Sequence, residues 1–106
     1  MLIATTTVAS SSEAEHLAAA CIEQNLAVCA QVEGPIHSHY VWQGRRTVAQ
    51  EWRITFKLLE TQADALTAYV HATHPYEVPQ WILVTAARVG EKYLSWARAP
   101  RSSINL

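Results

Sequence analysis

Two helix-start signals, each preceded by a run of strand-forming residues, constrain the fold of this chain most strongly. Leu2–Ala9 is rich in β-branched residues and predicts a strand. Ser12 and Glu15 follow it with the S-x-x-E spacing of a capping box, and Thr61 and Asp64 form a T-x-x-D variant further along. These signals predict helices from Ser12 to about Gln24 and over Gln62–Thr73, with apolar stripes at Ala14, Leu17, Ala18, Cys21 and Ile22 and at Ala63, Leu66, Tyr69 and Val70.

The remaining segments complete a β-α-β-β-α-β order. A short strand is expected at Leu26–Val32, and it resumes over Ile36–Gln43 after the Gly34-Pro35 interruption. Gly44-Arg45-Arg46 predicts the turn of a hairpin. Further strands are expected at Val48–Leu59 and Trp81–Ala86, and a short terminal helix at Glu91–Arg98. This order predicts an α+β, ferredoxin-like βαββαβ sandwich with an extra C-terminal helix, in which both main helices cover one face of an antiparallel sheet. With half of its residues apolar, the chain suits a single domain over residues 1–106.

The uncovered face of such a sheet should be polar, but the strand segments do not alternate cleanly. Leu2-Ile3-Ala4, Ala27-Val28-Cys29-Ala30 and Trp81-Ile82-Leu83-Val84 are apolar at consecutive positions, and the chain has four tryptophans. An apolar face of this size is unusual on a monomer, so we expect sister copies to cover it in a closed homo-oligomer. The alternative is a monomer whose terminal helix folds over the face, although that helix is only about two turns long.

Charge and composition exclude several classes of partner. The net charge is −1, and the eight lysines and arginines are scattered, so nucleic acid is not expected as a partner. No apolar run is long enough to cross a bilayer, and the N-terminus lacks the basic region of a signal peptide. We therefore expect a cytoplasmic protein in which Cys21 and Cys29 are free thiols.

The segment His74-Pro75-Tyr76-Glu77-Val78-Pro79-Gln80-Trp81, called here the proline loop, is the first candidate site. Its two prolines stiffen the chain around an imidazole, a phenol and a carboxylate. His74 and Glu77 are ordinary ligands for Cu(II) or Zn. The alternative is structural: His74 would cap the preceding helix, and Glu77 would pair with an arginine at a subunit boundary.

Three residues outside the loop are further candidate metal ligands. The thiolate of Cys29 would favour soft metals such as Cu(I), whereas burial in an apolar strand would make the thiol inert. His37 and His39 are two residues apart in a predicted strand, so both imidazoles would point to one side as a chelating pair. Exposed strand histidines are also common without any ligand, and this pair would need a third donor.

Five motifs in the same chain resemble the CutA1 family of divalent-cation tolerance proteins. They are Ala27-Val28-Cys29-Ala30, Tyr40-Val41-Trp42-Gln43-Gly44, Gln50-Glu51-Trp52, His74-Pro75-Tyr76-Glu77-Val78-Pro79 and Tyr93-Leu94-Ser95-Trp96. The resemblance implies a ferredoxin-like homotrimer similar to the PII signalling proteins, a link to tolerance of copper and other divalent metals, and no established enzyme reaction. The copper site proposed for that family uses a strand-one cysteine and a His-His pair before Pro-Tyr. Here those places hold Thr6, Thr73 and His74.

Two other functions remain open. A PII-like sensor would hold a small molecule or anion in clefts between subunits, with Lys57, Arg45, Arg46 and Arg53 as candidate anion-binding residues. An enzyme would use His74 with Glu77 or Tyr76 as acid and base. The sequence has neither a nucleophile constellation nor a cofactor fingerprint, so the enzyme ranks last.

Overall fold

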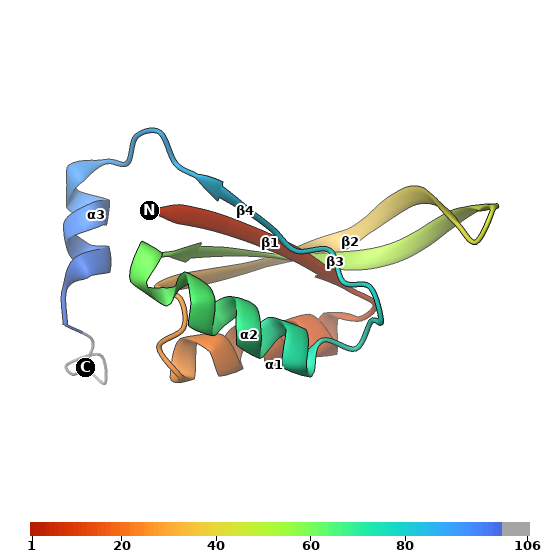
Figure 1. Cartoon of the computed structure of the whole chain (residues 1–106), viewed down its shortest axis with the longest axis horizontal. Coiled ribbons are helices and arrows are strands. Elements are labelled where there is room, and N and C mark those ends of the chain that lie inside the picture. Colours follow the sequence, from red (N-terminus) through yellow and green to blue (C-terminus); the bar gives the residue numbers. More distant parts are fainter. Residues whose placement is uncertain (101–106) are drawn as a thin grey trace.

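The order of elements is the predicted one, and it builds a sheet with helices on a single face. The structure, a computed structural model, describes residues 1–100. Its elements are β1 (Leu2–Val8), α1 (Ser11–Glu23), β2 (Cys29–Trp42), β3 (Arg45–Leu58), a 3-10 turn η1 (Glu60–Gln62), α2 (Ala63–Thr73), β4 (Ile82–Thr85) and α3 (Glu91–Arg98). The strands form one antiparallel sheet in the order β2-β3-β1-β4, with α1 and α2 packed on the same side (Figure 1). The ferredoxin-like α+β prediction is confirmed, whereas the extent of the domain to residue 106 stays a prediction.

Helix α1 begins two residues earlier than the capping signal indicated. Ser10, in an extended conformation, is the N-cap, and its hydroxyl oxygen accepts a hydrogen bond from the backbone N–H of Glu13 at 3.1 Å. The same hydroxyl donates to the Glu13 carboxylate at 2.9 Å. The capping pair is therefore Ser10 and Glu13, and Ser12 lies inside the first turn.

Helix α2 also begins differently from the prediction. Thr61 lies in η1 and makes no capping hydrogen bond. Instead the side chain of Gln62 accepts from the backbone N–H of Leu59 at 2.9 Å and donates to the backbone carbonyl of Asn25, also at 2.9 Å. Gln62 thus ties the start of α2 to the end of α1.

The hydrophobic core lies between the sheet and the two helices. Even-numbered residues of β1 and β3 point into it, and the rings of Phe56 and Trp81 pack edge-on with centroids 6.0 Å apart. The predicted helix stripes are confirmed, because every member is buried or packs against the core. The buried core residues are Ala4, Val8, Ala14, Leu17, Ala18, Cys21, Ala27, Ile54, Phe56, Leu58, Leu66 and Val70.

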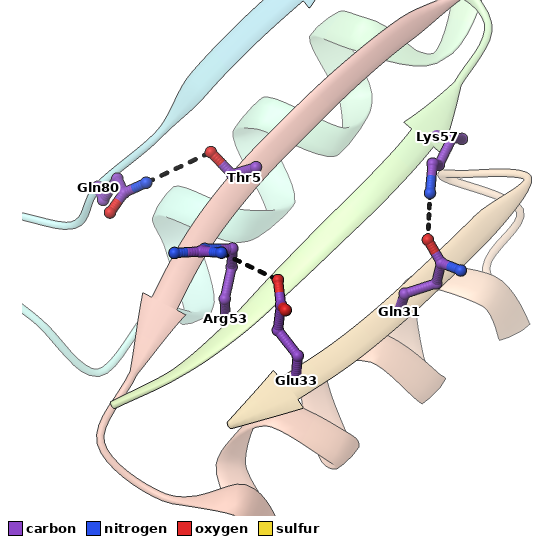
Figure 2. Close-up of polar contacts among 6 residues, drawn as sticks. All are labelled: Thr5, Gln31, Glu33, Arg53, Lys57 and Gln80. Atoms are coloured by element: carbon purple, nitrogen blue, oxygen red, sulfur yellow. Dashed lines mark hydrogen bonds and ion pairs between the residues drawn. The ribbon is translucent and has the colours of Figure 1, made fainter. Parts of the chain in front are cut away.

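The opposite face of the sheet, called here the open face, is more polar than the sequence pattern indicated. Exposed apolar side chains lie on β4, at Ile82 and Val84, each about half exposed. The centre of the face is polar, so the exposed apolar side chains do not cover the whole face, and the expectation that sister copies cover it stays a prediction. Figure 2 shows three polar pairs there: Gln80 Nε2 to Thr5 Oγ1 at 3.3 Å, Arg53 to Glu33 at 3.0 Å, and Lys57 to Gln31.

Strands β2 and β3 form a long hairpin that projects past β1 and β4 (Figure 1). Its turn is Gln43-Gly44, one residue earlier than predicted, and both residues have positive φ (51° and 76°), as a tight two-residue hairpin requires. The Gly34-Pro35 interruption is a bulge within β2, between the pairs Glu33–Arg53 and Ile36–Glu51. Helix α3 lies beyond the end of the strands where β1 begins, and it does not cover the open face (Figure 1). None of the described helices is long and apolar enough to cross a membrane.

Candidate functional site

His74 fixes the beginning of the proline loop. It is the C-cap of α2, and its backbone N–H donates to the carbonyl of Val70 at 2.8 Å. Its Nδ1 accepts from the backbone N–H of Tyr76 at 3.0 Å. Nδ1 is therefore unprotonated, so Nε2 carries the ring proton and donates to Thr6 Oγ1 at 2.9 Å. Burial lowers the pKa of His74 and so favours this neutral form.

These two hydrogen bonds bear on the copper site implied by the family resemblance. The places that correspond to its cysteine and one of its histidines, Thr6 and His74, do meet. The third place, Thr73, donates its hydroxyl to the carbonyl of Tyr69 at 2.8 Å. A metal ion at His74 would have to replace one of the hydrogen bonds that hold the ring.

Tyr76 links the loop to the base of the hairpin. Its hydroxyl donates to Glu51 Oε2 at 2.7 Å. The centroid of its ring lies 5.0 Å from the centroid of the His74 ring. Burial, together with the hydrogen bond to Glu51, raises the pKa of Tyr76, so the phenol stays protonated. Glu51 is only 6% exposed. The sequence pointed to Glu51 only as part of the Gln50-Glu51-Trp52 motif and gave it no role.

Glu51 and Tyr76 lie in the wall of a cleft of about 630 Å³ between the proline loop and the hairpin. The cleft opens on the side of the sheet away from α1 and α2. Glu51 and Arg53 are two residues apart on β3, so both side chains point to this open face. No lysine or arginine of residues 1–100 lines it; the lining residues are Thr7, Ser38, His39, Tyr40, Trp42, Glu51, Tyr76, Glu77, Val78, Pro79 and Gln80.

The cations considered for an anion site therefore lie elsewhere. Arg53 pairs with Glu33, and Lys57 donates to Gln31, both on the open face (Figure 2). Arg45 is the first residue of β3, next to the hairpin turn, and Arg46 follows it. The structure does not gather these four side chains around the cleft.

The structure does not bring the other candidate metal ligands into one group. His39 and Glu77 are both lining residues of the cleft, but His39 is odd-numbered after the bulge in β2, so its imidazole points to the side of the strand opposite to that of Tyr40 and Trp42. His37 is exposed and two residues from His39 on β2, and neither imidazole hydrogen-bonds to another described residue. Cys29, at the far end of β2 opposite Lys57, is half-buried and distant from them. Within residues 1–100 no three His, Cys, Asp or Glu side chains are grouped closely enough to hold a metal ion, and the ligand assignments stay predictions.

Comparison with known proteins identifies relatives for nearly the whole chain. Residues 2–100 match the family described as CutA1 divalent ion tolerance protein. "Protein CutA 1, chloroplastic" of Oryza sativa subsp. japonica is 34% identical over 92 residues, which are 87% of this chain and 52% of that protein. The "Divalent-cation tolerance protein CutA" of Yersinia pestis is 35% identical over 89 residues, 83% of this chain and 74% of that protein. The chain thus spans about half of the rice protein and most of the bacterial one.

Solved structures give the same family. The divalent cation tolerance protein (Cut A1) of Thermus thermophilus superposes with a TM-score of 0.87 at 32% identity, covering 92% of this chain and 96% of that one. CutA of Synechococcus elongatus superposes with a TM-score of 0.87 at 35% identity, covering 92% and 86% of the two chains.

Proposed function

Because this chain belongs to the CutA1 family of divalent-ion tolerance proteins, we propose that it binds divalent cations, copper foremost, as a cytoplasmic homotrimer and without enzymatic activity. The observation that carries the proposal is the family match over residues 2–100. A binding role also fits the chemistry of the chain, because two of its acid–base groups are already engaged in hydrogen bonds: the ring of His74 with Thr6 and with the backbone N–H of Tyr76, and the phenol of Tyr76 with Glu51.

His37 and His39 are the ligand pair that we favour. Both imidazoles are exposed and free of hydrogen bonds to described residues, whereas both ring nitrogens of His74 are engaged. Neutral imidazole is a good ligand for Cu(II) and Zn. Glu77 offers a carboxylate from the nearby proline loop, and Cys29 would suit Cu(I) at a separate place. Residues 1–100 of one chain hold no group of three such donors, so a complete site would draw on a second subunit.

Two features support the homotrimer. The sheet is covered by helices on one face only, and the open face carries exposed Ile82 and Val84 beside its polar pairs. The projecting hairpin exposes Tyr40 and Trp42 by 44% each. Large aromatic side chains at this exposure are typical of a surface that another copy covers.

Titration calorimetry with CuCl₂ and ZnCl₂, combined with light scattering for the assembly mass, tests the proposal. We expect a trimer mass, and we expect the His37→Ala, His39→Ala double variant to lose about tenfold or more in copper affinity. His16→Ala, which removes an exposed imidazole from α1, is the matched control and should bind as the wild type does. Copper binding no tighter than millimolar, or equal in the double variant, would refute the ligand assignment, and a stable monomer would refute the assembly.

The cleft favours a second candidate function, that of a small-molecule sensor. A concave site of about 630 Å³ with aromatic walls and several polar groups is typical of ligand pockets in proteins. Since no lysine or arginine of the described residues lines it, an anion is a poor choice of ligand.

A further inference from the structure

We draw no further inference here: the strongest candidate, the groove between the start of α1 and the end of α2 that Glu13, His16, Tyr69 and Thr73 line, carries nothing because nothing in the described residues shows what covers it.

Discussion

Replacing Tyr76 with Phe tests whether the proline loop is fixed by its hydrogen bond to Glu51. The substitution keeps the ring and removes the hydroxyl that donates to Glu51 Oε2 at 2.7 Å. Because Glu51 is 6% exposed, little water can replace the lost donor. Hydrogen bonds to charged groups contribute about 1.5–3 kcal/mol, so we expect the free energy of unfolding to fall by about 2 kcal/mol.

The assay is urea unfolding followed by circular dichroism at one fixed protein concentration, because the stability of an oligomer depends on concentration. Tyr69→Phe removes the hydroxyl of a half-buried tyrosine, which bonds to no described residue, and it should change stability by less than about 0.5 kcal/mol. In Glu51→Gln, Tyr76→Phe should cost less than it does in the wild type, because the acceptor is no longer charged. A loss in Tyr76→Phe no larger than that in Tyr69→Phe would refute the reasoning.

The pH dependence of the free energy of unfolding gives a second test of the hydrogen bond between Tyr76 and Glu51. Folding raises the pKa of Tyr76, so the folded state favours the protonated phenol. The resulting stability is fully present below the ordinary tyrosine pKa of about 10 and is lost as pH rises above it. Tyr76→Phe should therefore flatten the decline of stability at alkaline pH, and an unchanged decline would contradict the assignment.

Three further predictions concern stability and reactivity. Gly34→Ala should lower the free energy of unfolding by about 1–3 kcal/mol, because a Cβ there would lie 2.4 Å from Cδ1 of Trp52; unchanged urea unfolding would contradict this. Because burial lowers the pKa of His74, neutral His74 contributes to the free energy of unfolding above the ordinary histidine pKa of about 6.5, and this contribution is lost as pH falls below that value. Urea unfolding measured across this pH range should show a fall in stability at acidic pH that is smaller in His74→Gln. Equal pH profiles for the two proteins would contradict the prediction. Burial raises the pKa of Cys21 to about 11, so mass spectrometry should find N-ethylmaleimide on Cys21 only after denaturation, and rapid labelling of the native chain would show that the thiol is accessible.

The sequence predicted the order of the elements and the buried helix stripes because both depend on local periodicity. It misplaced the start of α1 because the chain offers two S-x-x-E pairs, Ser10 with Glu13 and Ser12 with Glu15. Only the first pair forms the capping hydrogen bond, from the backbone N–H of Glu13 to the hydroxyl of Ser10. Which pair caps the helix depends on where the chain leaves β1, and this is set by the tertiary fold.

The site was harder to predict, because its contacts join distant parts of the chain. Tyr76 and Glu51 are 25 residues apart, and His74 and Thr6 are 68 apart. The sequence marked the proline loop as rigid and His74 as its first polar group. It contained no sign that both ring nitrogens would be engaged, or that Glu51 would turn away from solvent.

The bulge in β2 changes which side of the strand odd-numbered residues occupy. Between the pairs Glu33–Arg53 and Ile36–Glu51, β2 advances by one residue more than β3 does. Odd-numbered residues of β2 share the side of Arg53 before this point, and even-numbered ones, such as Tyr40 and Trp42, share it afterwards. Losing one residue here would straighten the ladder and leave every outer side chain on its present side, whereas a one-residue loss elsewhere in the strand would invert part of it. At this bulge, related chains can therefore differ in length by one residue while the residues of β2 that line the cleft keep their side of the strand.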